Sequence, residues 1–264
     1  LLERGDARSD GDRSPEEAAR HALKSALLAQ RLGSYDEAEL VVRSARQGIA
    51  AGPLAGELDA AFALVHCSRG RFELAWTVVQ AALDKLGASA PELRVRALLL
   101  RAKGDVSLGL GRVADAVDAY DQSSRLLDPL SEPLEHSAAV VGSGNARLAS
   151  GRPDEAERLF QRAERQKLAI GDRWGLAQVH DGFARACLYK GRLADAVSHA
   201  QRAVLLAVAI PSSIFLPKLL DLFKLSPIVQ GILTGMWPFL ALPPFIWVLA
   251  RANRARIARV VVTH

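Results

Sequence analysis

The sequence predicts an all-α solenoid built from five helical hairpins, and three observations support this fold class. One pattern of glycine and small residues recurs five times along the chain. The glycines that mark it are spaced by 37, 41, 40 and 40 residues, a period typical of stacked helical repeats. Half of the residues are hydrophobic but only 6% are aromatic, and Ala, Leu and Arg are abundant, which favours helix over strand.

Each repeat is marked by a glycine that ends a first helix and by small or apolar residues at fixed distances from it. The glycines are Gly33, Gly70, Gly111, Gly151 and Gly191. Seven residues earlier stand Ala26, Ala63, Gly104, Gly144 and Ala184, and five residues later stand Ala38, Ala75, Ala116, Ala156 and Ala196. Nine later are Val42, Val79, Tyr120, Phe160 and Ala200, and twelve later are Ala45, Ala82, Ser123, Ala163 and Ala203. Glycine can leave a helix through a left-handed conformation, and small residues let antiparallel helices cross closely.

Local signals for the starts of helices agree with this period. The stretches Ser14-Pro15-Glu16-Glu17 and Ser34-Tyr35-Asp36-Glu37 each place a serine three residues before a glutamate, as in a capping box. In the first of them, proline follows the serine, a favoured residue for the opening turn. We therefore expect one helix to begin near residue 15 and another near residue 35.

Over about residues 15–205 the pattern resembles the tetratricopeptide repeat (TPR) family. The small residue, the glycine and the alanine match its signature, as does the residue two after each glycine: Tyr35, Phe72, Val113, Pro153 and Leu193. The first-helix aromatics of the family are mostly missing, and a period near 40 exceeds its usual 34. With the stretch Ala169–Ala177, the long period resembles the TPR variety of large LuxR-like bacterial regulators. That resemblance implies a regulatory or sensing arm of a larger protein.

Stacked hairpins form a superhelix whose inner surface is lined by first helices, a groove suited to a peptide or helix. Counting back ten and six residues from the last three glycines gives the positions that face inward. These are Arg101, Asp105, Val141, Asn145, Asp181 and Arg185. Their polar members, all but Val141, are candidates for holding a peptide backbone or a terminal carboxylate of a protein partner. The alternative is that they are ordinary solvated positions.

Catalysis, metal binding and nucleic-acid binding by the repeats find no support in the sequence. Gly142-Ser143-Gly144-Asn145 lacks the Lys-Ser/Thr ending of a phosphate loop, and the six histidines show no metal-ligand spacing. Residues 205–264 hold six basic and one acidic side chain, so the other 204 residues have no net charge and no excess from which to build a basic face. We expect neither catalytic residues nor a cofactor.

The chain divides by composition into residues 1–13, expected to be disordered, the repeats over 14–209, and an apolar segment over 210–264 with a basic end. Residues 225–250 carry no charged side chain and are long enough to cross a membrane, although they contain three prolines. Alternatively, the segment caps the last repeat or arises from a shifted reading frame. Two widely spaced cysteines favour a reducing cytoplasm.

These features predict a protein-interaction scaffold in the cytoplasm. The chain opens on Leu1 without a methionine, so we interpret it as a processed product or as part of something longer, such as a bacterial signalling or transcription-control protein. Two alternatives remain open at this point. One is a membrane-tethered TPR adaptor that uses residues 225–250. The other is a non-catalytic fragment of a multidomain enzyme.

Overall fold

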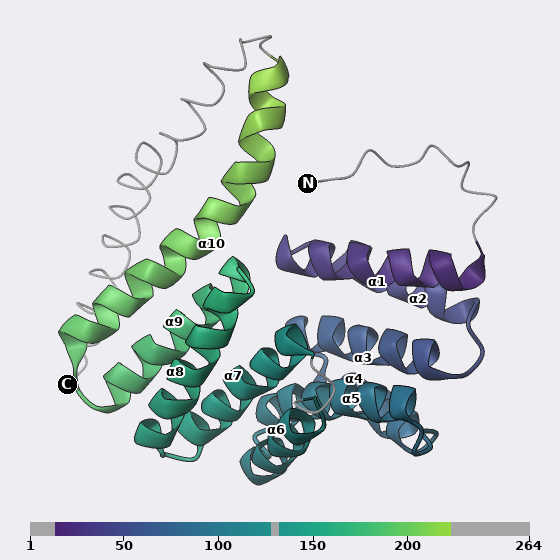
Figure 1. Cartoon of the computed structure of the whole chain (residues 1–264), viewed down its shortest axis with the longest axis horizontal. Coiled ribbons are helices and arrows are strands. Elements are labelled where there is room, and N and C mark those ends of the chain that lie inside the picture. Colours follow the sequence, from purple (N-terminus) through teal and green to yellow (C-terminus); the bar gives the residue numbers. More distant parts are fainter. Residues whose placement is uncertain (1–13, 128–131, 223–264) are drawn as a thin grey trace, which may run out of the picture.

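The computed structural model describes residues 14–127 and 132–222, with side chains described as far as residue 207, and all of its secondary structure there is helical. The helices are α1 (Pro15–Arg31), α2 (Tyr35–Gln47), α3 (Pro53–Ser68), α4 (Phe72–Leu83), α5 (Ala90–Gly109), α6 (Val113–Leu127), α7 (Pro133–Ala149), α8 (Pro153–Ala169), α9 (Arg173–Tyr189) and α10 (Leu193–Leu222). Successive pairs stack into a curved array (Figure 1), which confirms the predicted α-solenoid of five hairpins.

The glycine that separates the two helices of each hairpin has the predicted left-handed conformation. Its φ angle lies between 71° and 79° at all five positions. At the first turn, the Gly33 N–H donates to the Gln30 carbonyl at 3.1 Å and the Ser34 N–H to the Ala29 carbonyl at 2.9 Å. This is the Schellman arrangement, which satisfies carbonyls that the helix end leaves open.

One predicted capping box forms and the other does not. Ser14 and Glu17 exchange both hydrogen bonds at the start of α1. Ser34 precedes α2 but its side chain caps nothing. The reason is that Ser34 also closes the preceding Schellman turn, which holds its backbone at φ −82° and ψ 62° instead of the extended conformation that Ser14 has.

The residue nine after each of the first four glycines fills the space between two first helices. Val42 clusters with Ala26 and Ala61, and Val79 clusters with Ala63 and Ala102. The third and fourth repeats place aromatic rings there, Tyr120 and Phe160, each at most 1% exposed. The two positions that flank each ring hold glycine instead of alanine. Gly104 and Gly142 flank Tyr120, and Gly144 and Gly182 flank Phe160.

The glycines are needed because the rings occupy the space of their missing side chains. A Cβ atom on Gly144 would lie 2.5 Å from Cε1 of Phe160, and one on Gly182 would lie 2.6 Å from the same atom. Protein interiors are packed closely enough that one added methyl group forces such neighbours to shift. The larger side chain on one helix is therefore matched by smaller ones on the two helices around it.

Ion pairs join neighbouring hairpins along the edge that carries the turns. The basic residues directly before and after the second glycine, Arg69 and Arg71, contact Glu39 of the first hairpin at 3.1 and 3.2 Å. The last two hairpins repeat this arrangement. There Lys190 lies 2.9 Å from Glu157, which Arg192 also contacts. The charged residues stand at the same distances from the turn glycine in both places. These ion pairs are therefore part of the regular contact between one hairpin and the next.

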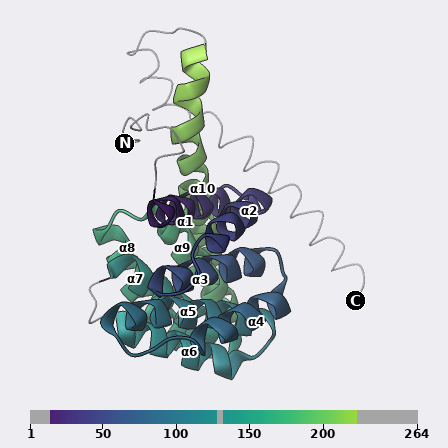
Figure 2. The same cartoon turned by 90° about the vertical axis from the view of Figure 1, so that its right-hand side faces the viewer.

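The last helix, α10, extends beyond the other hairpins (Figure 2) and past the compositional boundary at residue 209. Within the described residues no helix is both long and apolar enough to cross a membrane. The segment 225–250, for which a membrane span, a cap or a shifted reading frame was considered, lies outside the described residues, as do residues 1–13. The division of the chain into these segments stays a prediction.

The fit between Phe160 and its two glycines can be tested by exchanging the sizes of its members. We expect Gly144→Ala to destabilise the protein by about 1 kcal/mol, because overpacking costs about 1–3 kcal/mol and the gain in helix propensity returns at most about 1 kcal/mol. Phe160→Val should cost about 3 kcal/mol through the cavity that it leaves. Urea unfolding measures each free energy.

The informative variant combines Phe160→Val with Gly144→Ala and Gly182→Ala. The two added methyl groups refill the cavity, so this triple variant should be more stable than Phe160→Val alone. The matched control joins Phe160→Val to Gly104→Ala and Gly142→Ala, whose glycines face Tyr120 instead. Equal stability of the two triple variants would contradict the fit.

Candidate functional site: the concave groove

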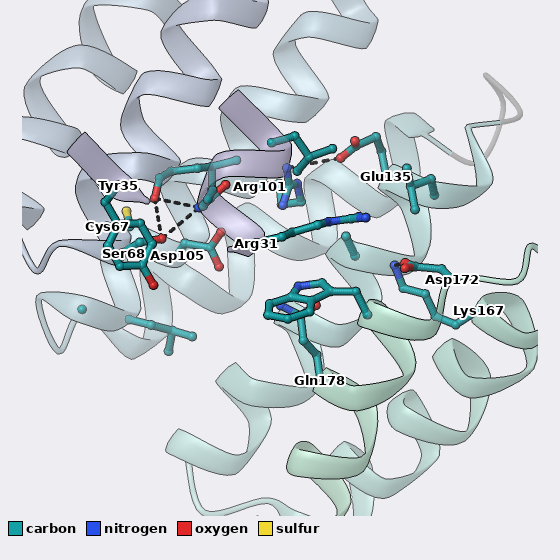
Figure 3. A pocket seen from close by; sticks show the side chains of 18 of the residues that line it. Arg31, Tyr35, Cys67, Ser68, Arg101, Asp105, Glu135, Lys167, Asp172 and Gln178 are labelled. Atoms are coloured by element: carbon teal, nitrogen blue, oxygen red, sulfur yellow. Dashed lines mark hydrogen bonds and ion pairs between the residues drawn. The ribbon is translucent and has the colours of Figure 1, made fainter. Parts of the chain in front are cut away.

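The inner surface of the superhelix contains a groove with two adjoining pockets. The central pocket has a volume of about 620 Å³ and is lined by residues from both ends of the array, from α1 to α9 (Figure 3). The second pocket, of about 470 Å³, lies along α5, α7, α9 and α10. Both are lined by Arg101, Asp105, Ala138, Trp174 and Gln178, so they are compartments of one groove.

All five polar residues selected from the sequence line the second pocket. They are Arg101, Asp105, Asn145, Asp181 and Arg185, and Val141 lies among them. Arg101 and Asp105 also line the central pocket. The count from each turn glycine thus located one face of three successive first helices, while a binding role for these residues remains a prediction.

Three polar residues of the second pocket contact one another. Arg185 donates a hydrogen bond to the Asn145 side-chain oxygen at 2.7 Å and lies 3.1 Å from the Asp181 carboxylate. The hydrogen bond ties α9 to α7 across a step of the solenoid, and the ion pair lies within α9.

The floor between the two pockets carries a more buried network. Arg101 lies 3.2 Å from Glu135, and the Tyr120 hydroxyl donates a hydrogen bond to Asp105. Burial raises the pKa of Asp105, although the charge of Arg101 and the Tyr120 hydrogen bond oppose this. Burial and the neighbouring carboxylate raise the pKa of Tyr120 well above its ordinary value. The network joins the packed ring of Tyr120 to the groove surface.

Trp174 and Arg31 are groove residues that the sequence reasoning missed. Trp174, in the first turn of α9, is half-buried and lines the central pocket, the second pocket and a third pocket at the turn between α8 and α9. Arg31 reaches the central pocket from the last turn of α1 (Figure 3), and its Nε atom is buried without a hydrogen-bond partner among the described residues. The rarity of tryptophan was the available signal for Trp174.

A buried ion pair fixes the start of α9 and hence the position of Trp174. Lys167 Nζ lies 2.7 Å from an Asp172 carboxylate oxygen, and the two side chains are 3% and 8% exposed. The other Asp172 oxygen accepts the Gly175 N–H at 3.0 Å and caps the helix. Burial alone would raise the pKa of Asp172, but the hydrogen bonds from Lys167 and Gly175 hold it below its ordinary value.

One cysteine, Cys67, lies in the central pocket of the groove. Burial raises the pKa of the Cys67 thiol in the central pocket to about 12, so this sulfur is a thiol at neutral pH. No three His, Cys, Asp or Glu residues gather as a possible metal site among the side chains described, which are those of residues 14–127 and 132–207.

The fold is an α-solenoid of tetratricopeptide-type hairpins. No protein-family model matches the chain, and no curated protein matches it by sequence. Solved structures do match. They include PlcR of Bacillus thuringiensis in complex with the peptide PapR7 and DNA, with a TM-score of 0.59 and 12% identity over 78% of this chain and 75% of that chain.

Two further matches have the same fold. Aspartyl phosphate phosphatase F of Bacillus subtilis gives a TM-score of 0.55 at 13% identity, over 86% of this chain and 63% of that chain. The TPR protein TTC0263 of Thermus thermophilus gives 0.52 at 18% identity, over 75% of this chain and all of that chain. These likenesses confirm the predicted TPR-type fold.

The contribution of the Lys167–Asp172 pair to stability can be tested by changing its two members in turn. Lys167→Met leaves the buried Asp172 carboxylate without its cation and should cost about 3 kcal/mol in the free energy of unfolding. Adding Asp172→Ser removes the unpaired charge but keeps an oxygen that can cap Gly175, so part of the loss should be recovered. The two variants are compared by urea unfolding. If adding Asp172→Ser destabilises the protein further, the Asp172 carboxylate contributes to stability through something other than its ion pair with Lys167.

Proposed function

We propose that this protein is an interaction module that binds an extended peptide segment of a partner protein in the concave groove. The observation that carries the proposal is the groove itself, which has two adjoining pockets with Trp174 at their junction and a row of paired polar side chains beside it. A half-buried tryptophan surrounded by hydrogen-bonding groups is a typical anchor of protein recognition.

The lining residues supply the two kinds of contact that a peptide needs. Trp174 and the apolar wall formed by Val141, Ala177 and Val204 can accept a side chain. Asn145 and Gln178 carry both a donor and an acceptor, which suits the N–H and C=O groups of a peptide backbone. Among the structures of similar fold, the PlcR complex contains a peptide, which supports this class of ligand.

The same comparison supports a regulatory role, in which binding of a peptide or protein is the signal. The PlcR structure also contains DNA. The repeats of the present chain would then form the sensing part of a bacterial signalling or transcription-control protein. The two other possibilities, a membrane-tethered adaptor and a fragment of an enzyme, gain no support from the contacts of the described residues.

Selection of peptides from a phage-displayed library of random dodecamers, against the purified full chain, tests the proposal. Peptides selected in this way should lose at least about tenfold in affinity when Trp174→Ala removes the central anchor. The double variant Asn145→Ala with Arg185→Ala should also weaken binding, while circular dichroism should show unchanged helicity. Fluorescence anisotropy of the labelled peptides measures the affinities.

The control is Gln122→Ala with Arg125→Ala, which removes the same two chemical groups from exposed positions on the outer helix α6. This pair should leave the affinity unchanged. Peptides that bind the Trp174→Ala and Asn145→Ala/Arg185→Ala proteins as tightly as the parent would remove the groove assignment, and so would a selection that yields no peptide.

A further inference from the structure

Two histidines meet where the last helix packs on the solenoid. His180 of α9 and His199 of α10 approach with their Nδ1 atoms 3.2 Å apart. His180 is buried, and the ring of His199 stacks on Phe183 with centroids 4.9 Å apart and planes inclined by 26°. α10 packs mainly on α9, so this contact belongs to the one large interface that holds α10.

The contact depends on protonation because of the chemistry of the imidazole ring. A hydrogen bond between two Nδ1 atoms needs one protonated nitrogen as donor and one unprotonated nitrogen as acceptor. The pair can therefore keep its bond when both rings are neutral or when one ring is charged. When both are charged, each Nδ1 is a donor, and the bond is replaced by repulsion between two cations.

The charged groups around the pair are of both signs. Glu164 of α8 lies 3.7 Å from the other nitrogen of His180 and favours its charged form. Arg202 disfavours the charged form of both rings, while Asp195 favours and Arg192 disfavours that of His199. Burial is the largest influence on each ring, and together these effects lower the pKa of both histidines from their ordinary value of 6.5.

The helix held by this contact also forms part of the proposed binding site. Ala203, Val204 and Ala207 of α10 line the second pocket together with Asn145 and Trp174. They follow His199 by one to two helical turns, so a displacement of α10 at the histidine pair would move this wall.

We propose that the His180–His199 contact is a proton-sensitive joint that holds α10 against α9 and thereby sets one wall of the concave groove. Each ring is more easily protonated in the unfolded chain than in the fold. The stabilisation that the joint provides is therefore complete above about pH 6.5 and is lost as the pH falls through the lowered pKa values. The consequence for peptide binding rests on the proposed function, whereas the joint itself does not.

Hydrogen exchange of the α10 amides tests the joint without any ligand. The full chain is compared at about pH 7.5 and about pH 5.5, after correction for the intrinsic pH dependence of exchange. The opening equilibrium of residues 193–207 should rise severalfold at the lower pH, because both rings gain protons more easily when α10 is open, while the amides of α5 should be much less affected.

Two variants separate the histidine pair from other acid effects. His199→Phe keeps a ring on Phe183 but cannot take a proton, and His180→Gln keeps a neutral hydrogen-bonding group, so α10 should lose its acid-induced opening in both. His21→Asn, at an exposed position on α1, should retain it. An opening of α10 that is the same at both pH values, or that persists in both variants of the pair, would overturn the proposal.

Peptide affinity at the two pH values then separates the joint from the proposed function. Peptides from the selection should bind more weakly at the lower pH in the parent chain and about equally at both in His199→Phe. If no peptide binds at any pH but α10 still opens in acid, the proposed function fails and the joint stands. If peptides bind and α10 does not open, the joint fails and the groove stands.

Discussion

The fit of one side chain between two neighbouring first helices is the constraint on which the rest of the solenoid depends. Every hairpin must dock on the next at nearly the same distance, so the volume at that junction has to stay nearly constant along the array. The first two junctions fill this volume with a valine between two alanines. The next two fill it with an aromatic ring between two glycines. A change in one helix therefore requires opposite changes in two others.

This constraint also explains how much of the fold was predictable from the sequence. The glycine at each turn and the alanine five residues later recur because each hairpin has the same local geometry, so a search for periodicity finds them. Gly142 and Gly182 have no such local reason, because the ring that requires them belongs to the preceding hairpin. Ser34 shows a different difficulty. The sequence around it predicted a helix cap, but its backbone closes the preceding Schellman turn and its side chain does not cap α2.

The residues of the candidate site were likewise predictable only in part. The residues Asn145, Asp181 and Arg185 were predicted because they occupy equivalent places in successive repeats, and a period carries that information. Arg31 and Trp174 lie in helices far apart in sequence and share the central pocket only because the superhelix curves. That curvature is the sum of small rotations between hairpins, so no single repeat contains it.

The charges of the groove indicate how it would select a partner. Three of its basic side chains are already paired, Arg101 with Glu135, Lys167 with Asp172 and Arg185 with Asp181. A lining of this kind attracts neither acidic nor basic ligands over long distances. A charged group that breaks the buried Lys167–Asp172 pair would leave an unpaired charge in a low dielectric, which is costly. Selectivity would then come from the rejection of wrong partners, while the affinity for the right one would come from Trp174 and the apolar wall beside it.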